Sequence, residues 1–257
     1  MSDVSIITRT KNREVLLWRA LRSVASQDFK GEIEWIIVND GGLRNGVEDV
    51  AKAAKNLGIN VMVLHLKQPT FGMEDASVQG VNVSTGKYLV IHDDDDSWES
   101  EFLTKTVSAI DSNNTDAVVT RIMGIFEKIE GNHVVTEHAQ EWNQGLKKNF
   151  SSSNFHKLEQ HNFWPPISML FTRRIYDEVG GFDPKIRVLG DWDFNLRLWK
   201  STEIYFLPEI LANYHLRFSG QRENLNSIVN QSEHFYASEH YIRHKLREQV
   251  FLGAVIE

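Results

Sequence analysis

The sequence predicts an α/β fold around one mostly parallel sheet, and two observations carry this prediction. Four short apolar runs recur in the first half of the chain, at Val4–Ile7, Trp35–Val38, Val61–Leu64 and Tyr88–Ile91. Segments with helical spacing separate them, and this alternation is typical of βαβ units with parallel strands. Because the runs are apolar apart from Ser5, we expect helices to cover both faces of the sheet.

The predicted helices follow from the spacing of apolar residues. Residues 13–26 place Leu17, Leu21 and Val24 on one face, with Asn12 in the position of a cap. Further helices are predicted over residues 46–57, 73–83 and 98–111.

The second half of the chain is less regular. Residues 116–138 predict a β-hairpin that turns at Glu130-Gly131-Asn132, and residues 143–162 form a long polar segment. Long segments of this kind are typically lids over a site, or disordered. Strands are predicted at 167–171, 205–207 and 210–214, and helices at 172–179, at 190–200 and from 223 onward. No repeat or composition break divides the chain, so we expect one domain over 1–218 and a helical extension over 219–257.

Composition excludes several classes of protein. The 28 Lys and Arg against 35 Asp and Glu give a net charge of −7, which argues against nucleic acid as the partner. Without cysteine there is no disulfide framework or thiolate metal site, and a reducing cytoplasm is the simplest location. No apolar stretch reaches the ~20 residues that span a bilayer, and the first residues lack the pattern of a signal peptide.

Polar residues follow three of the predicted strands. Thr8-Arg9-Thr10 follows the first, Asn39-Asp40-Gly41-Gly42 the second, and His92 with Asp93 to Asp96 the fourth. Ligands of open parallel sheets bind outside the carboxyl ends of the strands, so these residues predict one site.

The run of four aspartates predicts a metal site. Adjacent carboxylates repel one another, and Mg²⁺ or Mn²⁺ relieves that repulsion through the oxygen ligands that such ions prefer. On an extended backbone Asp93 and Asp95 point to one side, and Asp94 and Asp96 to the other. The alternative is a solvated acidic loop. For Asp40 two roles stay open, an acceptor for a nucleotide base or a residue that forms the turn before Gly-Gly.

Two further candidates lie late in the chain. Asp191 has no basic partner at i+4 and begins a predicted helix, where it is either a general base or an N-cap. Asp193 and Arg197 are spaced for a structural salt bridge. His215 follows the last predicted strand, where a single histidine is more often structural than a ligand, and Arg217 beside it has the charge to balance phosphates.

These segments resemble the family 2 glycosyltransferases. The resemblance lies in Ser5 to Arg13, in Ile37 to Gly42, in Tyr88 to Trp98, in Gly180-Gly181-Phe182-Asp183 and in Gly190-Asp191-Trp192-Asp193, which occur in the family's order. It covers residues 3–218 and implies the GT-A fold, with a Rossmann-like nucleotide-binding half (1–98) and an acceptor half (99–218). The implied reaction is transfer of a sugar from a nucleotide sugar with inversion.

The resemblance also implies roles for individual residues. Thr8, Arg9, Thr10 and Asp40 would line the nucleotide pocket, with Asp93 and Asp94 holding the nucleotide sugar. Asp95, Asp93 and His215 would hold Mg²⁺ or Mn²⁺, and Asp191 would be the catalytic base.

Two departures from the family pattern stand out. Ala76-Ser77-Val78 stands where the family often has Ala-Arg-Asn, and Gly190-Asp191 stands where it usually has Glu-Asp. The aspartate of the second pair remains.

The family resemblance implies a glycan or lipid-linked acceptor, in bacterial surface polysaccharide synthesis at the inner face of the membrane. The amphipathic segment 239–251 suits a membrane surface, a partner or the chain's own domain. The alternatives to a glycosyltransferase are a non-catalytic nucleotide-sugar-binding domain and a sugar-nucleotide nucleotidyltransferase. The second usually needs a glycine-rich phosphate loop, and Thr8 to Arg13 contains no glycine.

Overall fold

The computed structural model describes residues 2–130, 133–142, 157–218, 225–226 and 232–254. The predicted hairpin turn at 131–132 and most of the polar segment 143–162 lie outside the described residues. So does much of the stretch 219–231, where the predicted helical extension begins.

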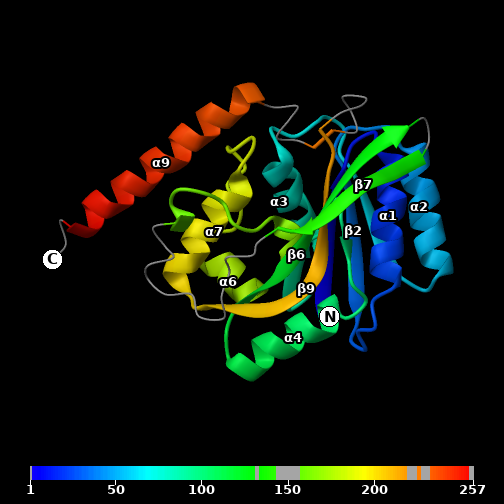
Figure 1. The fold of residues 1–257 in the computed structure, drawn as a ribbon, viewed down its shortest axis with the longest axis horizontal. Helices are drawn as coiled ribbons and strands as arrows, with labels where there is room; N and C mark the ends of the chain where they lie inside the picture. The colour runs from blue at the N-terminus through cyan, green and yellow to red at the C-terminus, as the bar shows by residue number, and fades with distance from the viewer. Residues whose placement is uncertain (1, 131–132, 143–156, 219–224, 227–231, 255–257) are drawn as a thin grey trace.

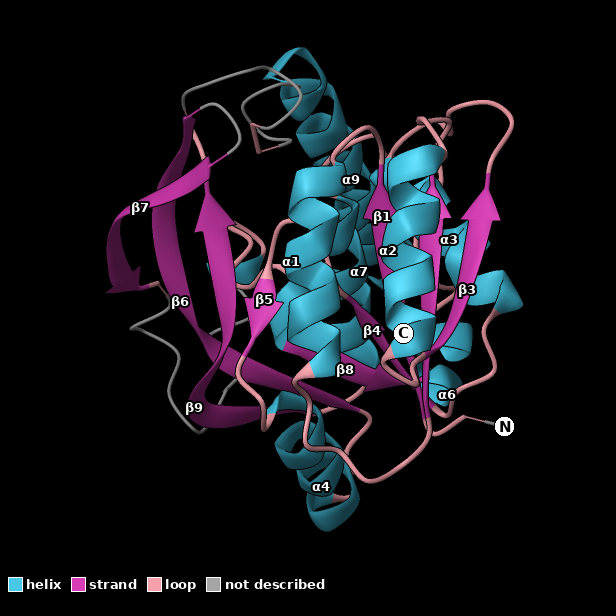
Figure 2. Ribbon diagram, turned by 90° about the vertical axis from the view of Figure 1, so that its right-hand side faces the viewer, coloured by secondary structure: helices cyan, strands magenta, loops and turns pink. Residues whose placement is uncertain are grey.

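The first half of the chain forms the predicted parallel sheet (Figures 1 and 2). Its strands are β1 (Val4–Thr10), β2 (Ile33–Asn39), β3 (Asn60–His65) and β4 (Tyr88–Ile91). They lie in the order β3-β2-β1-β4, each parallel to its neighbour. Every residue of β1 is buried, as expected of a strand covered on both faces.

The second half extends the same sheet and curls it. Its strands are β8 (Met169–Thr172), β6 (Ala117–Glu130), β9 (Ile204–Leu216) and β5 (Ser97–Trp98), and β7 (His133–Glu141) pairs with β6 as a hairpin. The strand β8 is antiparallel to both β4 and β6, whereas β6 and β9 are parallel. These pairings bring the carboxyl end of β9 toward that of β4.

Helices cover both faces of the sheet, and Figure 2 shows α1 and α2 in front of the parallel strands. The helices are α1 (Glu14–Ala25), α2 (Asn45–Asn56), α3 (Met73–Val83), α4 (Phe102–Asn113), α6 (Arg173–Glu178), α7 (Gly190–Ser201) and α9 (Ser232–Ala254). A 3₁₀ turn, η1, spans Pro166–Ser168. Alternate residues of β1 enter different cores, since Ile6 packs with α1 and α2 whereas Ile7 packs with α3 and α7.

Two predicted elements have different bounds. The helix predicted over 98–111 begins at Phe102, because Ser97–Trp98 pairs with β9 instead. The strands predicted at 205–207 and 210–214 are one strand, β9, whose pairing with β6 shifts register around Arg121. A register shift lets one strand pass through Pro208-Glu209, where the sequence pattern is interrupted.

The described part of α9 packs back on the domain. Ile242 is 1% exposed within the core that contains α7. Lys245 pairs with Asp183 at 3.0 Å and with Asp193 at 2.9 Å. Asp193 also forms the predicted salt bridge with Arg197, at 2.7 Å.

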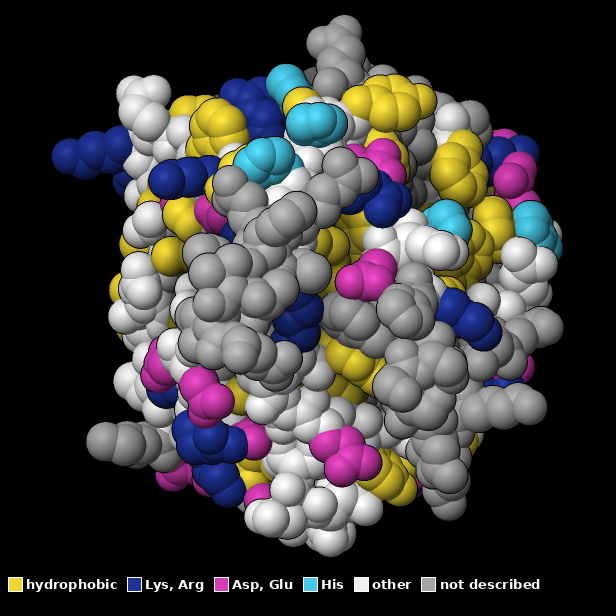
Figure 3. All heavy atoms as spheres, turned by 90° about the vertical axis from the view of Figure 1, so that its left-hand side faces the viewer, with side chains coloured by type: hydrophobic (Ala, Val, Ile, Leu, Met, Phe, Trp, Pro, Cys, Tyr) yellow, Lys and Arg dark blue, Asp and Glu magenta, His cyan; other side chains and the backbone are white. Residues whose placement is uncertain are grey.

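The surface that carries α9 is chemically mixed. In Figure 3, basic, acidic and apolar side chains are interspersed on its described part. Among the helices that the structure describes, none combines the length and the apolar character needed to cross a membrane.

Candidate active site

A cavity of about 1110 Å³ opens at the carboxyl ends of β1, β2 and β4. Its lining includes Arg9, Thr10, Asp40, Asp93, Asp94, Asp95 and Asp191. The sequence analysis placed all seven in one site, and the fold brings them together. A volume of this size is at the upper end of small-molecule sites.

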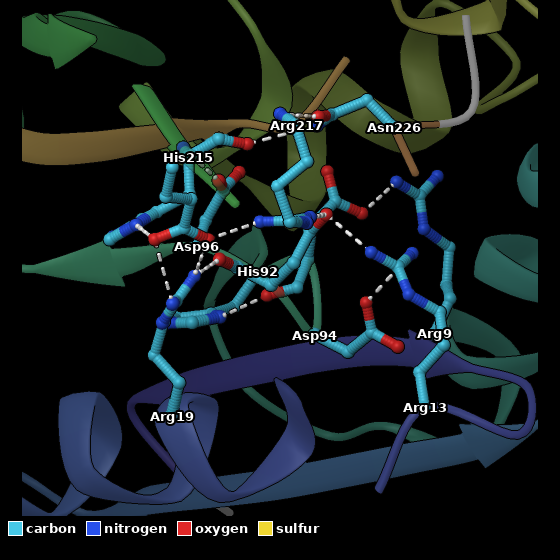
Figure 4. Close-up of polar contacts among 12 residues, drawn as sticks. Arg9, Arg13, Arg19, His92, Asp94, Asp96, His215, Arg217 and Asn226 are labelled. Atoms are coloured by element: carbon cyan, nitrogen blue, oxygen red, sulfur yellow. Dashed lines mark hydrogen bonds and ion pairs between the residues drawn. The ribbon is translucent and has the colours of Figure 1, made fainter. Parts of the chain in front are cut away.

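Arginines surround the run of aspartates (Figure 4). Arg9 pairs with Asp93, and Arg13 pairs with Asp94 at 3.1 Å and with Asp95 at 2.5 Å. Arg217, at the end of β9, also pairs with Asp95. A metal ion was expected to relieve the repulsion in this run, and Arg217 was expected to balance phosphates. The structure adds protein guanidinium groups that already neutralise much of the charge, and it places Arg217 against Asp95 instead.

A buried carboxylate on β6 joins this cluster, and the sequence analysis missed it. Glu127 accepts from Arg19 at 2.8 Å, from Arg217 at 2.5 Å and contacts His215 Nδ1 at 3.0 Å. Burial opposes its ionisation, but hydrogen bonds from His215 and Arg19 outweigh burial and lower the pKa of Glu127 to about 2. Nothing in the local sequence marks Glu127, because only the β6–β9 pairing brings it to the site.

The pKa values of Asp94, Asp95 and Asp96 are shifted in different directions. Burial raises the pKa of Asp94 to about 6, against the attraction of Arg13. Burial also raises the pKa of Asp96 well above its usual value, and the charge of Asp95 adds to this. Asp95 is also buried, yet Arg13 and Arg217 hold its pKa well below the usual range. Asp93 has the most exposed side chain of the four, at 22%, and faces the cavity.

Asp191 lies at the start of α7 and lines the same cavity. Burial raises the pKa of its carboxyl to about 6, although the Trp192 backbone N–H, Arg9 and Asn162 favour the charged form. Asn162 Nδ2 donates to Asp191 Oδ2 at 2.6 Å. A carboxylate with a pKa near neutrality, facing a cavity, suits a general base.

Glu74, in the first turn of α3, is a second buried acid that the sequence analysis missed. Its carboxylate pairs with Arg9 at 2.9 Å, and burial raises its pKa to about 7. Its sequence signal was only a position in the first turn of a weakly predicted helix.

Two predicted site residues lie outside the cavity lining. Thr8 is fully buried, and its hydroxyl accepts from Trp35 Nε1 at 2.8 Å. His215 has its ring nitrogens against Ser97 Oγ at 2.9 Å and Glu127. Because side chains alternate along a strand, Tyr214 faces the cavity and His215 faces away. As the structure places them, Thr8 does not line a nucleotide pocket and His215 does not offer a ring nitrogen to a metal.

The carboxylate oxygens that face the cavity suit a hard cation, whose other ligands would come from a substrate. Asp93 and Asp95 line the cavity, and Mg²⁺ is often held by one or two carboxylates together with phosphate oxygens. Among the described residues, no three His, Cys, Asp or Glu side chains are grouped to hold a metal by themselves. The donor set therefore fits a cation that arrives with a diphosphate, and Asp93 and Asp95 are the residues that would hold it.

Comparisons with known proteins agree with this architecture. Residues 5–180, more than half of the chain, match the family described as Glycosyl transferase family 2. An uncharacterized glycosyltransferase of Bacillus subtilis, YwdF, is 26% identical over 95% of this chain and 85% of its own length.

Two solved structures share the fold. The S. aureus TarS 1–349 complex with UDP-GlcNAc has a TM-score of 0.70 and 20% identity, over 93% of this chain and 65% of TarS 1–349. The mannosyltransferase PcManGT from Pyrobaculum calidifontis, in complex with GDP-Man and Mn²⁺, has a TM-score of 0.60 and 15% identity, over 83% of this chain and 58% of its own. The chain thus spans less than two thirds of either solved protein. With the GT-A-like fold and the family match together, this chain belongs to glycosyl transferase family 2 and is a glycosyltransferase.

Proposed function

We propose that the protein transfers a sugar from a nucleotide sugar to a hydroxyl group of a glycan or lipid-linked acceptor, with inversion and with Mg²⁺ or Mn²⁺. One observation carries the proposal. The half-buried carboxylate of Asp191, with its pKa raised to about 6, lines the same cavity as Asp93 and Asp95. A base and a diphosphate-binding edge in one cavity are the two parts that inverting transfer requires.

The donor is placed at the carboxyl ends of β1, β2 and β4. Thr10, Asp40, Asp93 and Asp94 line this end of the cavity. Asp40 Oδ1 accepts from the Thr70 backbone N–H at 2.6 Å, which fixes the carboxylate and leaves it acceptor capacity for a base N–H. We favour a UDP-sugar, since TarS, which shares the fold, is described in complex with UDP-GlcNAc.

The proposed chemistry uses Asp191 as general base. Its carboxylate takes the proton of the acceptor hydroxyl while that oxygen forms a bond to the anomeric carbon. The bond from this carbon to the diphosphate oxygen breaks on the opposite face, so the configuration inverts and the nucleoside diphosphate leaves. A bound divalent cation supplies Lewis-acid neutralisation of the diphosphate. Arg13, which lines the cavity, adds positive charge at the same place.

A donor screen with a base variant tests the proposal. We expect metal-dependent transfer or slow hydrolysis with one nucleotide sugar, UDP-sugars being tried first. Asp191→Asn should lose at least ~10³-fold in kcat because it removes the base, while calorimetry still detects UDP binding with Mn²⁺. The control is Asp177→Asn, at an exposed position of α6. Turnover by Asp191→Asn at the wild-type rate would show that Asp191 is not the general base.

The acceptor is tested in the same assay. A soluble glycan and the same glycan on a lipid carrier in vesicles are offered in parallel, which tests the expected site of action at the inner membrane face. Preference for the vesicle-bound acceptor supports peripheral association, and equal use of both forms argues against it.

A further inference from the structure

Gly190 leaves a space that Glu74 fills. A Cβ atom built on Gly190 would lie 2.1 Å from Glu74 Cγ and 2.9 Å from Glu74 Cδ. Gly190 is not among the described residues with positive φ, so its backbone conformation does not require a glycine. A side chain is excluded at this position because Glu74 occupies the space. The side chain that enters this space comes from α3, and its carboxyl is 2% exposed.

The carboxyl of Glu74 completes the start of α7. The residue before this helix, Leu189, has φ 65° and ψ 17°, and it supplies no side-chain cap. The first N–H groups of a helix have no partner within the helix, and a backbone in the left-handed region needs support from its surroundings. The Asp191 backbone N–H favours the charged form of Glu74, so α3 places an acidic group at the helix start that Leu189 leaves uncapped.

The same carboxyl also holds the Arg9 guanidinium. Arg9 Nη1 donates to Glu74 Oε2 at 2.9 Å and to Ser77 Oγ at 3.1 Å, and its other amino group pairs with Asp93. Arg9 is 8% exposed, and it belongs to the cavity lining. One carboxyl therefore lies against the start of the helix that carries Asp191 and is bonded to the side chain that pairs with Asp93.

We propose that Glu74 is a positioning residue for sugar transfer, which rests on the function proposed above. Its carboxyl, in the space left by Gly190, fixes the helix start that carries the base relative to the arginine beside Asp93. A displacement of reacting groups by about 1 Å can cost ~10²-fold in rate. The effect should therefore appear in kcat more than in the KM of the donor.

Moving the acid from one element to the other tests this proposal. Glu74→Ala should lower kcat at least ~10-fold, with the donor KM changed less than ~3-fold. Gly190→Glu alone should also lose activity, because two side chains would occupy one space. In the double variant Glu74→Ala/Gly190→Glu, a carboxyl re-enters that space from α7, and kcat should recover to within ~3-fold of wild type.

A conservative variant covers the case in which the double variant does not fold. Glu74→Gln keeps the volume of the side chain and one oxygen that accepts from Arg9, so it should retain more of kcat than Glu74→Ala. Melting temperature and UDP binding identify folded variants. The proposal is overturned if Glu74→Ala has wild-type kcat. It is also overturned if folded double and Gln variants are no better than Glu74→Ala.

The two proposals fail in different ways. If the wild-type protein transfers sugar and Asp191→Asn does not, the proposed function holds whatever Glu74 does. If wild type is inert with every donor, or Asp191→Asn stays active, the proposed function fails and this role for Glu74 fails with it.

Discussion

Asn162 donates a hydrogen bond to the carboxylate of Asp191, with 2.6 Å between Nδ2 and Oδ2. Its own carbonyl oxygen accepts from Asn195 Nδ2, one turn along α7 from Asp191, at 2.9 Å. Asn162 is thus tied to α7 at two points and orients the proposed base within the cavity.

Loss of this hydrogen bond should move the pH dependence of transfer. A donor to the carboxylate favours its charged form, so Asn162→Ala should raise the pKa of Asp191 above about 6. A general base works only when ionised, and activity is lost as the pH falls through its pKa. The acidic limb of kcat/KM should therefore move to higher pH by about one unit, equivalent to ~1.4 kcal/mol.

The measurement is kcat/KM from pH 5 to pH 9 for the wild type and the variant. The control is Asn113→Ala, since the Asn113 side chain donates to the Ala109 carbonyl oxygen within α4. An acidic limb at the same pH in Asn162→Ala would show that the base is not Asp191.

Arg217 should be important for stability. Its side chain is fully buried and pairs with Asp95 and Glu127. Arg217→Met fits the space but leaves two buried carboxylates short of a cation, which should cost about 3–5 kcal/mol of the free energy of unfolding. Urea unfolding at pH 7 measures this cost. Arg174→Met, at an exposed side chain that pairs with Glu178 and Asp116, should cost less than Arg217→Met, and equal costs would contradict the expectation.

The alternation of apolar runs and helices was enough to predict the sheet of β1 to β4, and the strand ends were enough to predict six residues of the cavity lining, whereas Asp191 also needed the family resemblance. Both depend on local pattern and on a general rule for parallel sheets. The pattern of Ile210 to Tyr214 did not show that β9 runs through Pro208, because a register shift depends on the partner strand. The amphipathic pattern of residues 239–251 left three packing surfaces open, and in the described part Ile242 is buried against the chain's own domain.

The missed residues share one physical cause. Glu127 contacts Arg19 and Arg217 across separations of 108 and 90 residues, and Glu74 contacts Arg9 across 65. No spacing rule within one element reaches that far. The metal role of His215 was implied by the family resemblance alone, and the sequence did not show which face of β9 its side chain occupies, because one residue of uncertainty in a strand reverses the face.

Glu127 should contribute stability that depends on pH. Its pKa is lowered in the folded protein from 4.5 to about 2, so its contribution is fully present above pH 4.5 and is lost as the pH falls toward 2. A shift of this size corresponds to about 3 kcal/mol. Glu127→Gln should therefore be less stable than wild type at pH 7, and the difference should shrink as the pH falls below 4.5. Urea unfolding at pH 7, 5, 4 and 3 measures it, and a difference that stays constant with pH would refute this account.

Removal of metal should abolish transfer, and Asp93 should set the metal requirement. Treatment with EDTA should lower the rate by at least ~10²-fold, because the charge developing on the diphosphate loses several kcal/mol of stabilisation, and Mn²⁺ should restore it.

Asp93 offers the most exposed carboxylate of its run. Asp93→Asn should therefore raise the Mn²⁺ concentration for half-maximal rate at least ~10-fold. Asp49→Asn, at an exposed position of α2, is the matched control and should leave it unchanged. If EDTA has no effect on a purified, active protein, the positive charge opposite the diphosphate comes from side chains such as Arg13, and Asp93 has another task.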